Sequence, residues 1–166
     1  MASSTQVSFS VPQRVIHWAM ALLIFFNLLF PDGMAHAYRL MRRGETLTPD
    51  QISSANIHAY VGFAILFLAV PRLCLRFFQG VPPNPAEEPR VFQIAAKVAH
   101  FTFYALFLIL PLSGIAAYYF GIQAAGQLHS GPFKALMWVL IAGHLVAVLV
   151  HQFYWRTGVL KRMTHG

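Results

Sequence analysis

The chain has 166 residues, of which 57% are hydrophobic and only 10% are charged, and its formal net charge is +7. Because a soluble domain carries roughly one-quarter charged residues, this composition excludes an ordinary soluble globular protein and indicates a small integral membrane protein. The single cysteine, Cys74, excludes an internal disulfide.

Four apolar segments follow one another along the chain, each close to the roughly 20 residues that a helix needs to cross a bilayer. No small-residue cleavage site follows the first of them, so we expect it to remain as a span rather than act as a removable signal peptide. The sequence therefore predicts an all-α, integral membrane four-helix bundle formed by residues 1–166 as a single domain. The expected spans are approximately residues 14–31, 56–78, 97–120 and 133–155.

Basic residues are unevenly divided between the two sides of this bundle. Eight lie on the side that carries both termini: Arg14, Arg72, Arg76, Arg90, Lys97, Arg156, Lys161 and Arg162. Four lie on the other side: Arg39, Arg42, Arg43 and Lys134. The positive-inside rule then places both termini in the cytoplasm. The positive net charge is thus a topology signal, and no repeat, phosphate loop or base-stacking motif indicates a nucleic-acid partner.

Histidines are unusually frequent, and every predicted span contains or begins with one. They are His17 in the first span, His58 at the outer end of the second, His100 at the inner end of the third, and His144 and His151 in the fourth, with His129 just before it. A lone histidine in a span is most simply satisfied by a neighbouring helix, but histidines at paired depths in four spans indicate a shared function. The spans contain no carboxylates, so a proton relay built from Asp, Glu and His is poorly supported.

Haem explains this distribution better than a single metal ion, because the histidines lie at two membrane levels. Haem iron takes two axial ligands, and a helix bundle can supply one imidazole from each of two facing helices. The pattern predicts two haems stacked across the membrane. Arg14, Arg72 and Arg76 are candidates for pairing with haem propionates at the cytoplasmic edge, although positive-inside anchoring is the simpler explanation for any one of them taken alone.

Motifs in all four spans resemble the bacterial cytochrome b561 family. They are RVIHW, NIHAYVG with a distal PRLCLR, AHFTFYALFLILPLSG, and GHLVAVLVHQFYWRTGVLKRM, and together they reach from Arg14 to Met163. The resemblance implies a dihaem membrane cytochrome of the bacterial inner membrane, which holds two haem b groups (iron protoporphyrin IX) and exchanges electrons with quinone. Some members are similar to superoxide oxidases, which pass electrons from periplasmic superoxide to ubiquinone. More distant relatives are haem-b subunits of membrane hydrogenases and formate dehydrogenases.

The fourth span offers two candidate iron ligands, His144 and His151, on one helix face. They lie about 10 Å apart along the axis, which is too close for one haem on each. A separation of about 14 residues, or about 20 Å, suits two stacked haems, and related families look like they use histidines at that spacing. Counting back from His144 reaches His129 after fifteen residues, and the resemblance also places His144 at the ligand position. We therefore expect His17 and His144 to ligate the cytoplasmic-side iron, and His58 and His129 the outer iron.

His129 is the uncertain member of this ligand set. Gly131-Pro132 follows it, and because proline favours the first helical turn, we expect His129 just before the helix, on loop backbone. If His129 is not a ligand, a different pairing follows, which depth counting from the end of the fourth span favours. The alternative pairs are His144 with His58 and His151 with His17.

His151 and His100 then remain as non-ligand histidines near the cytoplasmic side. Since quinone reduction takes up protons as well as electrons, they are candidates for a quinone or proton-transfer site; a hydrogen bond to a propionate or a carbonyl is the alternative. We expect a quinone-linked oxidoreductase that carries electrons from an outer donor, such as superoxide or a periplasmic redox partner, to ubiquinone or a related quinone among membrane lipid. The alternative is a haem-b anchor or electron-carrier subunit of a larger dehydrogenase or hydrogenase complex.

Overall fold

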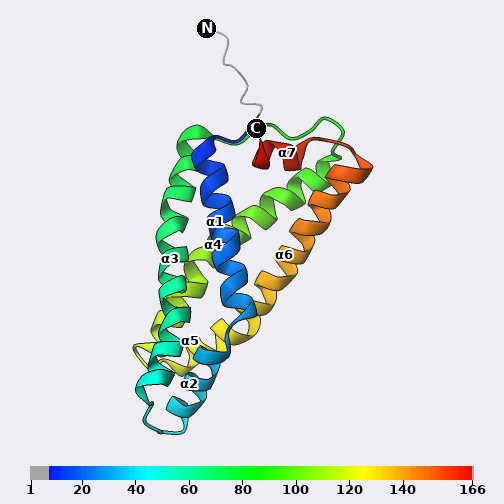
Figure 1. Cartoon of the computed structure of the whole chain (residues 1–166). Coiled ribbons are helices and arrows are strands. Elements are labelled where there is room, and N and C mark those ends of the chain that lie inside the picture. The colour runs from blue at the N-terminus through cyan, green and yellow to red at the C-terminus, as the bar shows by residue number, and fades with distance from the viewer. Residues whose placement is uncertain (1–7, 166) are drawn as a thin grey trace.

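The computed structural model describes residues 8–165, and this part of the chain is built from helices without a β-strand. Four helical segments are long and apolar enough to cross a membrane, which confirms the predicted all-α membrane bundle. They are α1 (Val11–Leu29), α3 (Pro49–Gln79), α4 (Arg90–Tyr118) and a fourth helical segment that runs from Gln123 to Tyr154. Each packs on its neighbours in the order α1, α3, α4, α6, as Figure 1 shows.

Short helices mark the two ends of the bundle. The amphipathic helix α2 (Asp32–Arg42) follows α1 and packs on the start of α3, whereas α7 (Val159–Thr164) lies at the opposite end (Figure 1). We call these the α2 end and the α7 end. The Phe9 amide donates to the Arg162 carbonyl at 3.3 Å, so the beginning of α1 and the C-terminal segment lie together at the α7 end.

Local sequence explains where the first two long helices begin. Ser10 and Thr48 are N-caps, and each forms a capping box with a glutamine three residues later, Gln13 and Gln51. The side-chain oxygen of the cap accepts from the free amide of that glutamine, and the glutamine side chain accepts from the cap amide. These reciprocal bonds satisfy amides that have no partner within the helix.

The fourth long segment is one continuous helix that contains two π-helical turns. It consists of α5 (Gln123–Leu128), η1 (His129–Phe133), α6 (Lys134–Leu149) and η2 (Val150–Tyr154). The expectation that His129 lies on loop backbone before this helix is therefore wrong. Pro132 lies inside η1 rather than starting the helix. A π-helical turn admits one extra residue into a helix, which lets the chain pass a proline that cannot donate a backbone hydrogen bond.

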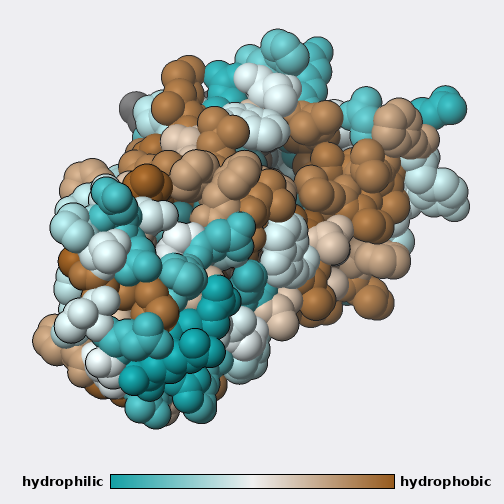
Figure 2. Space-filling view, turned by 60° about the horizontal axis from the view of Figure 1, so that its bottom comes forward, coloured by the Kyte–Doolittle hydropathy of each residue, from teal (hydrophilic) through white to brown (hydrophobic). Residues whose placement is uncertain are grey.

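The bundle has a small core and an extensive apolar exterior. Its core lies among α1, α3, α4 and α6 and consists of Met20, Ile65, Ala69, Leu106, Phe107 and Met137. Large hydrophobic side chains such as Phe67, Phe77 and Phe101 are instead mostly exposed. Figure 2 shows hydrophilic side chains gathered at the α2 end and hydrophobic ones along the flanks. This distribution is the one expected when lipid covers the sides of the bundle and water its ends.

Candidate functional site

Two histidines from facing helices meet near the α2 end, and we call them the outer pair. The ring centroids of His58, on α3, and His129, in η1, are 6.1 Å apart, with the ring planes at 75°. The Nδ1 atom of His129 lies 2.9 Å from the carbonyl oxygen of Leu110. Because a carbonyl oxygen only accepts, Nδ1 carries the proton and Nε2 keeps a free lone pair. This tautomer is the one that binds a metal through Nε2.

The position of His129 depends on a glycine in the facing helix α4. A Cβ atom on Gly114 would lie 3.1 Å from Cε1 and 3.3 Å from Nδ1 of His129. Such contacts are tighter than ordinary van der Waals packing, so only glycine leaves the ring its full space at this point. The neighbouring Ser113 hydroxyl oxygen lies 3.2 Å from His129 Nδ1 and adds a second polar contact.

A cavity of about 240 Å³ lies beside the outer pair and is lined by both of its rings. Most of the lining is apolar and comes from α1, α3, α4 and the fourth helix, with Lys134 as the lining cation. Two buried atoms on this lining, Asn27 Oδ1 and His58 Nδ1, have no hydrogen-bond partner among residues 8–165. A buried polar atom without a partner is costly, which marks the cavity as a binding site for a further group.

A second histidine cluster, the inner cluster, lies toward the α7 end. The ring centroid of His144 is 6.3 Å from that of His17 and 6.0 Å from that of His100. Arg72 Nη2 lies 2.9 Å from His17 Nδ1, and the buried Nε of Arg72 has no partner among the described residues. The guanidinium groups of Arg72 and Arg76 both lie near the Tyr104 ring, at 6.0 Å and 5.4 Å from its centroid.

The ring separation in both pairs is compatible with a shared metal, and that of His100 and His144, at 6.0 Å, meets the same criterion. A metal–imidazole bond of about 2 Å, with the nitrogen about 1 Å from the ring centre, separates the centroids of two opposed ligands by about 6 Å. The observed separations are 6.1 Å for the outer pair and 6.3 Å for His17 with His144. These residues therefore fit an iron between each pair, and the alternative pairs His144–His58 and His151–His17 are not the ones that the structure brings together.

The contact between Arg72 and His17 indicates which partner Arg72 would have once His17 binds a metal. A guanidinium only donates, so His17 Nδ1 accepts in this contact, whereas a histidine that ligates through Nε2 carries a proton on Nδ1. Arg72 and a ligating His17 therefore compete as donors, and an anionic group such as a propionate is the better partner for Arg72. Arg76 lies beside it. Arg14, in contrast, donates to the Thr164 carbonyl at 3.1 Å and lies at the surface.

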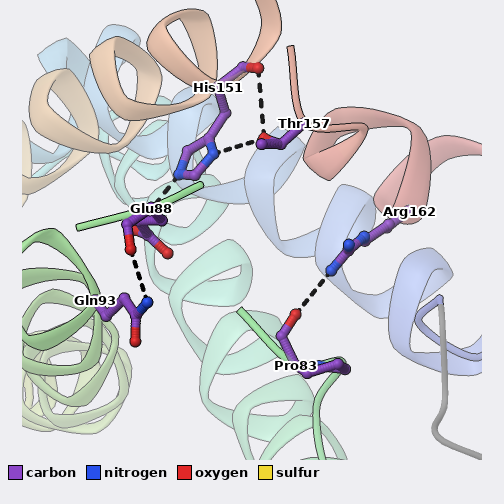
Figure 3. A network of polar contacts seen from close by, with 6 residues as sticks. All are labelled: Pro83, Glu88, Gln93, His151, Thr157 and Arg162. Atoms are coloured by element: carbon purple, nitrogen blue, oxygen red, sulfur yellow. Dashed lines mark hydrogen bonds and ion pairs between the residues drawn. The ribbon is translucent and has the colours of Figure 1, made fainter. Parts of the chain in front are cut away.

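His100 and His151, expected to form one site, belong to different groups of contacts. His100 contacts His144 in the inner cluster. His151 lies in η2 and contacts Thr157 and Glu88, as Figure 3 shows. Sequence reasoning did not single out Glu88, because it lies in the Pro-rich loop before α4 and nothing local signals its burial.

Four apolar helices with facing histidines at two levels define a class: helical membrane proteins that can hold a flat iron macrocycle between helices. The family described as prokaryotic cytochrome b561 matches residues 8–166, and the chain belongs to this family.

Two relatives align along almost their full lengths. Cytochrome b562 of Cereibacter sphaeroides is 32% identical over 154 residues, which are 91% of this chain and 91% of the relative. The probable superoxide oxidase CybB of Yersinia pestis is 28% identical over 177 residues, covering 93% of this chain and 94% of the relative. The chain is therefore a multi-pass bacterial membrane cytochrome that binds haem b and transfers electrons.

Proposed function

We propose that the chain carries single electrons from a donor at the α2 end to a quinone at the α7 end through two haem b groups. The α2 end would face the periplasm, and both termini would lie in the cytoplasm, as the positive-inside rule favours. The observation that carries the proposal is the presence of two facing histidine pairs, at two levels of one bundle, each with the ring spacing of an iron site. Haem b, when bound, supplies a one-electron redox centre whose potential depends on its ligands and surroundings.

The residues have distinct roles in this proposal. His58 and His129 would hold the outer haem, and His17 and His144 the inner one, with Arg72 and Arg76 at the propionates of the inner haem. Leu110 would fix the tautomer of His129 through its carbonyl group. The apolar core between the two levels would exclude water.

A small anion such as superoxide is a donor consistent with the α2 end. Lys134 lines the outer cavity, and α2 carries Arg39 and Arg42 in its last turn. Arg43 lies 4.0 Å from Glu45, so part of this positive charge is cancelled. Electrostatic steering by the remaining cations would raise the rate of encounter with an anion. The name of the Yersinia relative, a probable superoxide oxidase, supports the same choice.

The second candidate function is that of a haem-b anchor or electron carrier for a larger dehydrogenase or hydrogenase. The described loops and ends are short, which leaves little surface for a soluble partner. We therefore place it second.

A haem count and a rapid-mixing experiment test this proposal. The purified protein should show a b-type reduced-minus-oxidised spectrum with two haems per chain. His58→Ala or His17→Ala should each remove one haem, whereas His36→Ala, at an exposed position, should leave both. Superoxide should then reduce the haems, and a soluble ubiquinone analogue should reoxidise them. One haem per wild-type chain would refute the dihaem proposal, and inertness to superoxide with intact haems would favour the carrier or anchor.

A further inference from the structure

We propose that Glu88 is a proton-transfer residue that supplies protons to quinone through His151. The proposal deepens the proposed function, because it rests on quinone reduction at the α7 end of the bundle. It concerns a carboxylate that the haem sites do not use.

Glu88 and His151 form a buried pair between segments that are far apart in the sequence. Glu88 is 7% exposed and His151 is 8% exposed. The distance from Glu88 Oε1 to His151 Nε2 is 3.5 Å, and Figure 3 shows the two side chains directed at each other. Glu88 is the only acidic residue that is buried among residues 8–165. A buried carboxylate beside a buried imidazole is costly to keep unless it has a function or a firm partner.

Thr157 orients the imidazole toward the carboxylate. Its hydroxyl oxygen lies 2.7 Å from His151 Nδ1 and 3.4 Å from the His151 carbonyl oxygen. The hydroxyl donates to the carbonyl, which only accepts, and its oxygen then accepts from Nδ1–H. Nε2 is therefore the ring nitrogen that can gain or lose a proton, and it is the one that faces Glu88.

The contact between Glu88 and His151 is close, but it is longer than a strong hydrogen bond. A charge-assisted hydrogen bond between these groups has a length of about 2.7–2.9 Å, so a contact of 3.5 Å leaves the carboxylate free to exchange partners. Glu88 itself is anchored through its backbone, since Gln93 Nε2 donates to its carbonyl at 2.8 Å. The carboxyl group can thus change its protonation state without releasing the loop.

No cation competes for the Glu88 carboxylate within the described part of the chain. Arg162, from α7, donates to the Pro83 carbonyl at 2.8 Å instead, and Arg14, from α1, donates to the Thr164 carbonyl. The charged neighbours in the loop, Glu87 and Arg90, are exposed. Among the residues that the structure describes, His151 is therefore the only titratable side chain paired with Glu88, which suits exchange of a proton between these two groups.

The Glu88–His151 pair lies at the α7 end of the bundle, where a quinone would receive both protons and electrons. His151 is seven residues beyond His144, which is about 10 Å along a helix axis toward the α7 end. The residues on either side of Glu88 in the loop, Glu87 and Pro89, are exposed, so the proton path from water to Glu88 would be short. A quinone beside His151 would be within reach of both the inner haem site and a proton source in water.

The proposed step balances in protons and electrons. Two superoxide ions each lose one electron and become dioxygen, and one quinone gains these two electrons and two protons to become quinol. For each proton, the Glu88 carboxyl O–H bond breaks and an N–H bond forms at His151 Nε2. That N–H bond then breaks as an O–H bond forms on a quinone oxygen, and water reprotonates Glu88.

Replacement of Glu88 by its isostere tests the proposal, with its exposed neighbour as the matched control. Glu88→Gln should keep both haems and be reduced by superoxide at the wild-type rate. Its reoxidation by a soluble ubiquinone analogue should slow about 100-fold or more, since a positioned proton donor usually contributes roughly 10²- to 10⁴-fold. Glu87→Gln should behave as the wild type.

A wild-type rate of quinone-dependent reoxidation in Glu88→Gln would overturn this proposal and leave the proposed function intact. Failure of the wild type to bind haem or reduce quinone would instead overturn the proposed function. If Glu88→Gln does not retain haem, infrared difference spectra on quinone reduction decide the question. With ¹³C-labelled glutamate in Glu45→Gln/Glu87→Gln protein, Glu88 is the only labelled glutamate side chain. A labelled carboxyl band that changes supports proton transfer at Glu88, and its absence overturns it.

Discussion

Addition of a single methyl group at Gly114 should weaken haem binding at the outer pair. In Gly114→Ala, the new Cβ atom would lie 3.1 Å from His129 Cε1 and 3.3 Å from Nδ1. The ring would have to move by a few tenths of an ångström, which strains its 2.9 Å hydrogen bond to the Leu110 carbonyl. Overpacking of this kind costs about 1–3 kcal/mol, so haem affinity at this site should fall roughly 5- to 150-fold.

The haem-to-protein ratio, followed while free haem is diluted, measures this loss. Gly143→Ala is the matched control, because a Cβ atom there meets no atom within 4 Å although the residue adjoins His144, the proposed inner ligand. The control should retain both haems. Retention of both haems at wild-type affinity in Gly114→Ala would refute the inference that His129 is a ligand held in place by the facing helix.

Two further substitutions separate the roles of polar residues around the proposed haems. Arg72→Gln removes a buried cation next to His17 and should lower the midpoint potential of one haem by roughly 50–100 mV, since a nearby positive charge favours the reduced state. Arg14→Gln should shift neither potential in the same redox titration, and equal shifts in the two variants would contradict the assignment. Asn27→Leu removes the 3.1 Å donor to the His58 carbonyl and should weaken retention of the outer haem about fivefold. Unchanged retention in a haem-transfer assay would show that Asn27 does not support His58.

The sequence was sufficient to predict the four apolar helices, because long uncharged segments have few alternatives to spanning a membrane. The fifteen-residue spacing in the fourth span and the family resemblance also pointed to the four histidines that lie in facing pairs in the structure, whereas depth counting from the end of that span favoured the alternative pairs. Partners at the ends of the bundle were harder to predict. Arg14 bonds to the Thr164 carbonyl, a contact 150 residues away in the chain that depends on how the C-terminal segment folds back.

Glu88 is a second residue whose contacts could not be predicted from the sequence around it. Its neighbours in the loop are prolines and exposed residues, which is the local pattern of a solvated connection. Its burial arises because η2 and the segment around Thr157 pack over the loop, as Figure 3 shows. No periodicity within the loop encodes that packing.

The π-helical backbone at His129 explains how two histidines fifteen residues apart can be aligned as if they were fourteen residues apart. In a regular α-helix each residue turns the chain by about 100°, so positions fourteen apart lie about 40° from alignment on one side, and positions fifteen apart about 60° on the other. A single π-helical turn absorbs one extra residue. With η1 at His129–Phe133, the fifteen residues from His129 to His144 therefore follow nearly the path of fourteen in a regular helix. His129 and His144 thus face the same interior, toward His58 and His17, and the proline that seemed to exclude His129 from the helix instead marks the turn that aligns it.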